Sequence, residues 1–312
     1  MQVRAHTIIR LAKNYASHLI EDEPDPEEPE VAATLHAKAK RTAFCFSERN
    51  NRKERWKNHK RAGLFPKEMD KPYIDKDESY KWLKKGRLGY ENEKIILAAQ
   101  DQGLMTNGFK KMAGLSQSDQ CRFCHAAVES TTHLISACQT MLGDGHYTAR
   151  HNKVCRYLHW VICKEYKIET QPVWLHEPQR ITATEEVSIF YDKPIVLGRY
   201  VEGGAIKPDI VVWDKTKKEA KIIEVSVPND FGLNIAKREK VNKYQDLKND
   251  LRQTWELEQI DIIPVIVGAT GVVKDTLKSY LEAIPGKPSI EEVQLCAVTG
   301  TVSIIKRALS HT

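Results

Sequence analysis

Two short apolar runs constrain the fold of this chain more than any other feature of its sequence. The first run is Ile210–Trp213 (IVVW) and the second is Lys221–Val227 (KIIEVSV), with a lysine-rich polar stretch between them. Both runs are rich in β-branched residues and have the length of strands, so they predict a buried β-hairpin. We therefore expect the rest of the chain to be organised around this hairpin.

Each run carries an acidic residue beside its apolar residues. Asp209 stands directly before the first run, and Glu224 lies inside the second. A buried carboxylate costs several kcal/mol unless it is paired or bound to a metal, so two that converge indicate a divalent-cation site. Taken singly, Asp209 after Pro208 is typical of a turn, and Glu224 could pair with a lysine at a sheet edge.

Composition and charge favour an intracellular protein without a membrane span. The apolar content is 41%, no apolar run approaches the ~18 residues of a span, and residues 1–20 lack the apolar continuity of a signal peptide. The net charge of +6 is uneven: Glu21–Glu30 is acidic, whereas Lys38–Arg61 and Lys81–Arg87 are basic. Such blocks are commonly solvated faces or disordered tails, but basic ones also contact phosphates, so nucleic acid is the first partner to test.

A zinc site is predicted by the spacing Cys121-x2-Cys124-x8-His133-x4-Cys138. Three thiolates and one imidazole at this spacing can surround Zn²⁺ tetrahedrally, and a closed shell of four ligands indicates a structural or nucleic-acid-binding site. His125 also completes a Cys-x-x-Cys-His haem-attachment pattern. We reject haem because no export signal is present and because His133 and Cys138 would be left without a role. Unlinked buried cysteines are the remaining alternative.

The seven cysteines are odd in number and irregularly spread, which argues against a disulfide framework. Two more cysteines and two histidines lie in Tyr147–Tyr166, where apolar residues recur at helical spacing. We interpret these four residues as core or surface residues of a helix; they are His151, Cys155, His159 and Cys163.

The apolar pattern from about residue 150 predicts an α/β fold, with helices covering a mixed sheet. A linker, Glu169–Glu177, follows the first of these helices. The expected strands are Ile195–Val201, the two hairpin runs and Asp261–Val267. The expected helices are Tyr147–Tyr166, Phe231–Leu257, Val272–Ala283 and Glu291–Leu309, the last weakened by Gly300, with earlier helices at Val3–Ile20, Val31–Lys60 and around Trp82–Leu104.

A metal site of this kind suits phosphodiester cleavage, which needs a cation against developing charge and an aligned water. Asp209 and Glu224 would hold Mg²⁺, together with the main-chain carbonyl of Val225. In the commonest form of the PD-(D/E)xK nuclease signature, which this stretch resembles, a lysine follows the acid by two residues, but Ser226 stands there. Lysines spaced three apart on the next helix could replace it or could line a solvated face; they are Lys237, Lys240 and Lys243.

The zinc motif, the later Lys207-Pro208-Asp209 and Glu224-Val-Ser-Val-Pro228, and Lys240-x2-Lys243-Tyr244 together resemble a known family. They are similar to the carboxy-terminal part of site-specific non-LTR retrotransposon polyproteins, in which a zinc knuckle and a restriction-like endonuclease follow a reverse transcriptase. The resemblance covers about Trp82 to Leu309. It implies a restriction-endonuclease-like core of order αβββαβα, with acids at Asp209 and Glu224 and displaced lysines at Lys240 and Lys243. Of the two lysines we favour Lys240, because Lys243 precedes Tyr244, whose ring could anchor that turn in the core.

The resemblance also implies a function. Such a module nicks target DNA in the nucleus, so that the exposed 3′ hydroxyl primes reverse transcription of the element RNA, with structural Zn²⁺ and catalytic Mg²⁺. No Tyr/Phe-x-Asp-Asp polymerase motif occurs here, so we expect either a fragment of such a polyprotein or a separated endonuclease. The expected domains are a connector with the acidic, proline-rich run (1–78), a helical linker with the zinc knuckle (79–145) and the endonuclease (146–312).

Two other functions remain open at this stage. A protein derived from such an element could bind nucleic acid through the knuckle without cutting it. A junction-resolving or repair nuclease could use the same fold on branched DNA. The amino-acid sequence does not indicate which DNA sequence would be the target or what the oligomeric state is.

Overall fold

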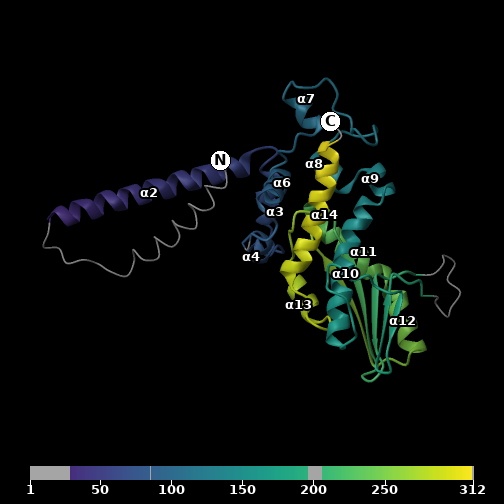
Figure 1. The fold of residues 1–312 in the computed structure, drawn as a ribbon. Helices are drawn as coiled ribbons and strands as arrows, with labels where there is room; N and C mark the ends of the chain where they lie inside the picture. Colours follow the sequence, from purple (N-terminus) through teal and green to yellow (C-terminus); the bar gives the residue numbers. More distant parts are fainter. Residues whose placement is uncertain (1–28, 85, 196–205, 311–312) are drawn as a thin grey trace. The chain divides into compact units, whose positions relative to one another are not determined.

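A computed structural model describes residues 29–84, 86–195 and 206–310 of the chain (Figure 1). The chain divides into two compact units, with the boundary between Trp56 and Lys57. We describe each unit separately.

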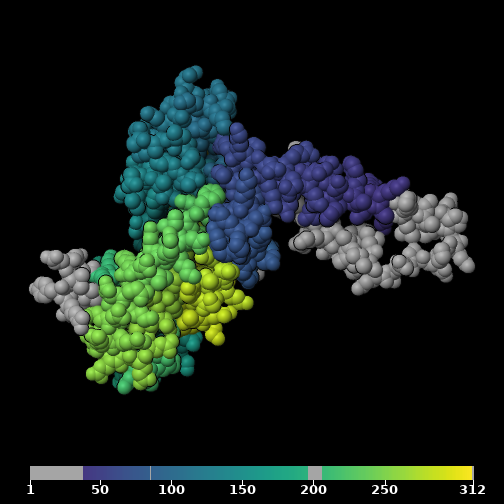
Figure 2. Space-filling view, turned by 180° about the vertical axis from the view of Figure 1, so that it is seen from behind, coloured from purple at the N-terminus to yellow at the C-terminus, as the bar shows by residue number. Residues whose placement is uncertain are grey.

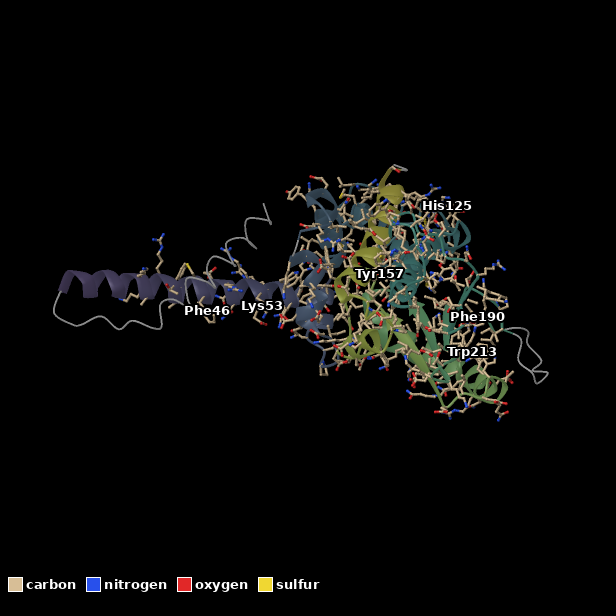
Figure 3. All side chains as sticks on the ribbon, turned by 60° about the horizontal axis from the view of Figure 1, so that its bottom comes forward. Phe46, Lys53, His125, Tyr157, Phe190 and Trp213 are labelled. Atoms are coloured by element: carbon tan, nitrogen blue, oxygen red, sulfur yellow. The ribbon has the colours of Figure 1, made fainter. Side chains whose placement is uncertain are left out.

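The described part of the first unit is helix α2 (Pro29–Asn58) as far as Trp56, and this helix confirms the one predicted over Val31–Lys60. Its side chains from residue 38 onward are almost all exposed, and these include Phe44 and Phe46 at 67% and 64%. Figure 3 labels Phe46 and Lys53 on this helix. Val3–Ile20 lies outside the described residues, as does most of the acidic run.

The second unit contains a mixed sheet of five strands in the order β1-β2-β3-β4-β5. Neighbouring strands are antiparallel except β4 and β5, which are parallel. The strands are β1 (Ile181–Ala183), β2 (Val187–Tyr191), β3 (Ile210–Asp214), β4 (Glu219–Ser226) and β5 (Gln259–Ile266). Strands β3 and β4 form the predicted hairpin, and its turn is closed by Asp214, whose Oδ1 accepts a hydrogen bond from the Lys217 backbone N–H. The α/β class with a mixed sheet is therefore confirmed.

Helices cover both faces of the sheet, because alternate residues of its strands are apolar on each side. One face packs on α10 (His146–Glu165), α13 (Leu277–Glu282) and α14 (Ile290–Ser310) through residues such as Ile223 and Val225. The other face packs on α12 (Gln245–Thr254) through residues such as Ile222, and α11 (Leu233–Lys243) lies beside β5. In Figure 2 the green segments that include α11 and α12 form much of the visible surface.

Helix α14 serves a second core on its other side. Val298 and Ile305 pack there with Trp82 and Ile96 from the short helices that precede the sheet. These helices are α3 (Leu64–Met69), α4 (Lys76–Ser79), α5 (Lys81–Lys84), α6 (Tyr90–Gln100), α7 (Asn107–Met112), α8 (Thr131–Ser136) and α9 (Gln139–Gly143). Figure 1 shows α14 in yellow running beside α10 in teal.

The strands that precede the hairpin differ from the prediction. Most of the strand expected at Ile195–Val201 lies outside the described residues, and its first residue, Ile195, forms an isolated bridge with Ile206. The sheet instead begins with β1 and β2, which the sequence did not indicate to us. Strand β2 reads VSIFY, and its pattern of burial has no clean alternation because Val187, Ser188 and Ile189 are all buried.

Two predicted helices also have different bounds. The helix expected over Phe231–Leu257 begins as a short 3₁₀ turn η1 (Asp230–Gly232) and breaks at Tyr244, which separates α11 from α12. Tyr244 is fully buried, and its hydroxyl donates to the Lys207 carbonyl, so the break places this ring in the core. The helix expected over Val272–Ala283 is shorter, because only Leu277–Glu282 is helical.

Gly300 does not interrupt α14. A Cβ at this position would lie 2.5 Å from the Cγ of Arg150, so the glycine allows α10 and α14 to approach each other closely. Within the described ranges, no helix is both long and apolar enough to cross a membrane.

Candidate functional site

The predicted acidic pair meets at the end of the hairpin. Asp209 immediately precedes β3, and Glu224 lies in the adjacent β4, with its side chain fully buried. The Asp209 backbone N–H donates to Glu224 Oε1 at 2.8 Å, and the Val225 backbone N–H donates to Asp209 Oδ2 at 2.8 Å. Antiparallel pairing of β3 with β4 thus brings together two acids that are fifteen residues apart.

Helix α11 brings Lys240 to these acids. Its Nζ lies 2.8 Å from Glu224 Oε2 and 3.8 Å from Asp209 Oδ2. The lysine side chain is 24% exposed, so this cation is held largely away from solvent between two carboxylates. A buried carboxylate needs such a partner, and here the helix after the hairpin supplies it.

Helix α10 brings His151 to the carboxylate of Asp209. The His151 Nε2 lies 3.1 Å from Asp209 Oδ2, and Cys155, one helical turn later, lies 3.6 Å from His151 Nδ1. The sequence did not predict a contact between His151 and the acids. The signal available was the spacing of His151 and Cys155, four residues apart on one helical face.

The pKa values of these groups follow from burial and from their mutual charges. Burial, together with the charge of Asp209, raises the pKa of Glu224. Burial also acts to raise the pKa of Asp209, but His151, Lys240 and the Val225 backbone N–H outweigh it and lower that pKa. Asp209 is therefore the more acidic member of the pair.

The pKa values of the two basic groups are raised by their acidic neighbours. Burial opposes the charged form of Lys240, but Asp209 and Glu224 outweigh burial and raise its pKa. Burial also opposes protonation of His151, and the neighbouring Cys155 and Asp209 raise its pKa. The site is thus a compact cluster in which basic side chains from two helices surround an acidic pair.

The structure does not place Lys243 with the acids. Its side chain is exposed, and its Nζ lies 4.8 Å from the centre of the Tyr244 ring. Lys237 likewise lies elsewhere, over the ring of Tyr280 at 5.0 Å. One turn of helix separates Lys240 from each of these lysines, and only its position faces the end of the hairpin.

The four predicted zinc ligands also come together. The ligand atoms of Cys121, Cys124, His133 and Cys138, which we call the Cys3His group, all lie within 4.8 Å of one another. Cys121 Sγ lies 3.8 Å from Cys138 Sγ, and Cys124 Sγ lies 3.4 Å from His133 Nε2. Tetrahedral zinc with Zn–S bonds of ~2.3 Å separates two sulfurs by about 3.8 Å, so this group could hold a metal ion and suits zinc.

The turn around the first two cysteines has the geometry that this group needs. Gln120 and Val128 form an antiparallel bridge, and the Cys121 N–H donates to the Ala127 carbonyl, so the chain doubles back sharply between them. Within this turn the Ala126 backbone N–H lowers the pKa of Cys124. Ser130 caps α8 through its side chain and thereby sets the position of His133.

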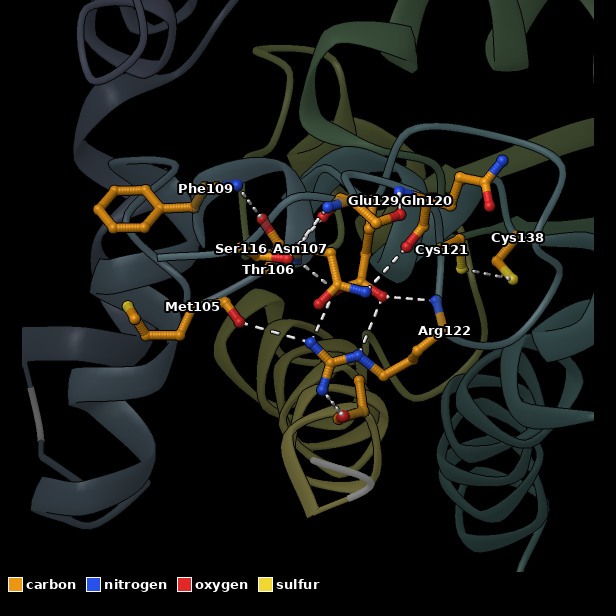
Figure 4. A network of polar contacts seen from close by, with 12 residues as sticks. Met105, Thr106, Asn107, Phe109, Ser116, Gln120, Cys121, Arg122, Glu129 and Cys138 are labelled. Carbon is orange, nitrogen blue, oxygen red and sulfur yellow. Dashed lines mark hydrogen bonds and ion pairs between the residues drawn. The ribbon is translucent and has the colours of Figure 1, made fainter. Parts of the chain in front are cut away.

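A buried ion pair supports the same turn (Figure 4). The Arg122 Nη2 lies 2.7 Å from Glu129 Oε1, and the Glu129 side chain is 0% exposed. Glu129 also accepts from the backbone N–H groups of Arg122 and Asn107, and Arg122 donates to the Ala308 carbonyl near the end of α14. Burial acts to raise the pKa of Glu129, but these hydrogen bonds lower it. The Cys3His group is therefore anchored to α14.

Comparisons with known proteins do not assign the chain to a family. No family model matches the chain, and no curated protein shows significant similarity to it.

Proposed function

We propose that the chain is a metal-dependent DNA endonuclease module, similar to the zinc-knuckle and restriction-like endonuclease region of non-LTR retrotransposon polyproteins. The observation that carries the proposal is the meeting of Asp209, Glu224 and Lys240 at the end of the hairpin. Two acids and a lysine displaced to the next helix are the set that the resemblance implies, and three separate elements converge to supply it.

The acidic pair fits a Mg²⁺ ion by its chemistry. Its donors are carboxylate oxygens, which hard divalent cations prefer, and the two acids already share a cation, the Lys240 ammonium, in the structure. Held by Asp209 and Glu224, Mg²⁺ would neutralise charge that develops on the phosphate during cleavage.

The protein groups have distinct roles in this proposal. Lys240, held beside Glu224, would orient or deprotonate the attacking water or donate to a phosphate oxygen. His151 holds Asp209 from the α10 side. Lys243, which lies over Tyr244, has no catalytic role in this scheme.

The Cys3His group would be a structural zinc knuckle in the same proposal. Together with basic residues it would contact nucleic acid, the target DNA and the element RNA, in the nucleus. The exposed basic side chains of α2 are suited to phosphate contacts; they include Lys40, Arg41, Arg49, Arg52 and Lys53.

The first prediction separates the two helix lysines. Lys240→Ala should slow single-turnover nicking of supercoiled plasmid with Mg²⁺ by ~100-fold or more, because a preorganised charge at the reacting phosphate is lost. Lys243→Ala is the matched control and should nick at the wild-type rate. Glu224→Gln, which preserves the shape of the buried side chain, should also abolish nicking while DNA affinity, measured by fluorescence anisotropy, stays nearly unchanged.

Three outcomes would count against the proposal. Equal nicking by wild type and both lysine variants would remove Lys240 from the mechanism. DNA binding without Mg²⁺-dependent nicking by the wild type would indicate a nucleic-acid-binding protein that does not cut. Strong preference for four-way junctions over linear and supercoiled DNA would indicate a junction-resolving nuclease.

A further inference from the structure

Helix α10 repeats one arrangement of side chains along its buried face. Histidine and cysteine alternate at four-residue intervals, at positions His151, Cys155, His159 and Cys163. The first pair faces Asp209, as described above. The second pair lies two turns further along the helix, with His159 2% and Cys163 1% exposed.

A third side chain reaches the second pair from another part of the chain. His176 lies in the segment between α10 and β1, which has no helix or strand, and is 6% exposed. Its Nε2 lies 2.8 Å from His159 Nδ1, and Cys163 Sγ lies 3.5 Å from the same His159 nitrogen. All three ligand atoms lie within 4.8 Å of one another.

We propose that His159, Cys163 and His176 form a second zinc site, separate from the Cys3His group. Imidazole nitrogen and thiolate sulfur are the donors that zinc prefers, whereas Mg²⁺ and Ca²⁺ prefer oxygen. Two ligands come from one helical face four residues apart, which places both on the same side of an ion. The fourth position of a tetrahedral ion would then be filled from outside this group.

One of the two distances in this group matches a bound zinc ion, and the other is that of a hydrogen bond. Tetrahedral zinc separates a sulfur from a nitrogen by about 3.5 Å, which is the distance between Cys163 and His159. The ligand nitrogens of two imidazoles on one zinc lie about 3.3 Å apart. His159 Nδ1 and His176 Nε2 are 2.8 Å apart, which is the distance of an N–H···N hydrogen bond. Zinc binding would therefore replace one hydrogen bond and move His176 outward by about half an ångström.

The site would fasten an otherwise irregular segment to the helix. Between α10 and β1 the described contacts to the helix include the Trp160 Nε1 donating to the Gln171 carbonyl at 3.1 Å and an ion pair between Arg156 and Glu177 at 3.1 Å. Both contacts are exposed, so each contributes little to stability. A metal bound at His176 would hold this segment in place far more strongly than either contact.

The test is the zinc content of the purified full chain, measured by elemental analysis. We expect Cys163→Ser and His176→Asn each to lower the content by one zinc per chain relative to wild type. Cys296→Ser is the matched control, because Cys296 lies half-buried on α14 and belongs to none of the ligand groups found among the described residues. Equal zinc in the wild type and in both ligand variants, together with identical Co²⁺ spectra, would overturn the proposal.

A second measurement covers loss of zinc during purification. Co²⁺ added to metal-free protein should give sulfur-to-cobalt charge-transfer absorption. The part of this absorption that comes from Cys163 should disappear in Cys163→Ser and should persist in Cys121→Ser. Zinc should also slow amide exchange in residues 168–180 of the wild type but not of Cys163→Ser. Identical spectra and exchange in both proteins would show that His159 and His176 are only a hydrogen-bonded pair. Neither readout involves DNA cleavage, so the outcome is independent of the proposed function.

Discussion

At the scale of single residues, buried charges hold the second unit together at several points. Arg150 is 3% exposed and donates to the carbonyls of Ile135 and Val227 and to the Thr301 hydroxyl. These three acceptors belong to the end of α8, the segment after β4 and α14. Burial lowers the pKa of Arg150 to about 10, so its charge is retained at neutral pH. One guanidinium thus joins three elements where no apolar side chain could satisfy their backbone groups.

Asp230 is a second buried charge, and it makes stability depend on pH. Its two oxygens accept hydrogen bonds from the backbone N–H and the hydroxyl of Thr270. Burial nevertheless raises its pKa from 3.8 to about 6. The folded state therefore holds this proton more tightly than the unfolded state does. Its contribution to stability is greatest below pH 3.8 and is lost as the pH rises through about 6.

We expect Asp230→Asn to remove this dependence. The free energy of unfolding of the wild type, relative to that of the variant, should fall by about 3 kcal/mol between pH 3.5 and pH 7, since each pKa unit corresponds to ~1.4 kcal/mol. Urea denaturation of both proteins at several pH values measures the difference. A difference that stays constant across this range would show that Asp230 has an ordinary pKa.

At the scale of elements, the contact between α10 and α14 determines how closely the sheet is covered. Gly300 lies where the two helices meet, because a Cβ there would approach Arg150 Cβ at 2.7 Å and Arg150 Cα at 3.0 Å. Glycine lowers intrinsic helix stability by about 1 kcal/mol relative to alanine. From the sequence alone, Gly300 is therefore expected to weaken the helix. In the fold, its missing side chain allows α10 and α14 to pack closely.

Gly300→Ala should consequently destabilise the protein in spite of its better helix propensity. We expect a net loss of roughly 1–2 kcal/mol, because the helices must separate or Arg150 must move. Ser303→Ala, at an exposed position of the same helix, is the control and should leave stability within ±0.5 kcal/mol. Thermal unfolding compares the three proteins, and an unchanged or higher Tm for Gly300→Ala would contradict close packing at this site.

At the scale of the whole molecule, α14 connects the Cys3His group to the sheet. Near its carboxyl end, Ile304 and Ala308 pack with Cys121 and Cys138, and the Arg122 guanidinium binds the Ala308 carbonyl. Nearer its beginning, Val293 and Ala297 belong to the core that covers the sheet. A metal held by the Cys3His group would therefore stabilise the carboxyl end of α14. The other end of the same helix packs on the sheet.

Cys121→Ser should show this connection. Loss of metal should accelerate amide exchange in residues 301–310 at the end of α14, because binding and local folding are coupled. Exchange in β4 should change little, since the sheet core lies at the other end of the helix. Cys45→Ser is the control, because Cys45 is exposed on α2. Equal acceleration in β4 and α14 would mean that the two regions unfold together.

Local spacing in the sequence was sufficient for those features that depend on neighbours along the chain. The Cys3His group, the hairpin and the helices over α2, α10 and α14 were predicted because their ligand spacing or apolar period is contained within one short segment. The acidic pair follows from the hairpin alone, since antiparallel pairing brings Asp209 and Glu224 together.

Only the tertiary structure decided the features that depend on distant contacts. The sequence favoured Lys240 over Lys243 only through the neighbouring Tyr244, whereas the docking of α11 places Lys240 against the acids and Lys243 over the Tyr244 ring. The break at Tyr244 arises because its buried ring and hydroxyl contact another segment, which no local propensity reports. His151 and His176 likewise gain their partners across the fold, where burial makes unpaired polar groups costly.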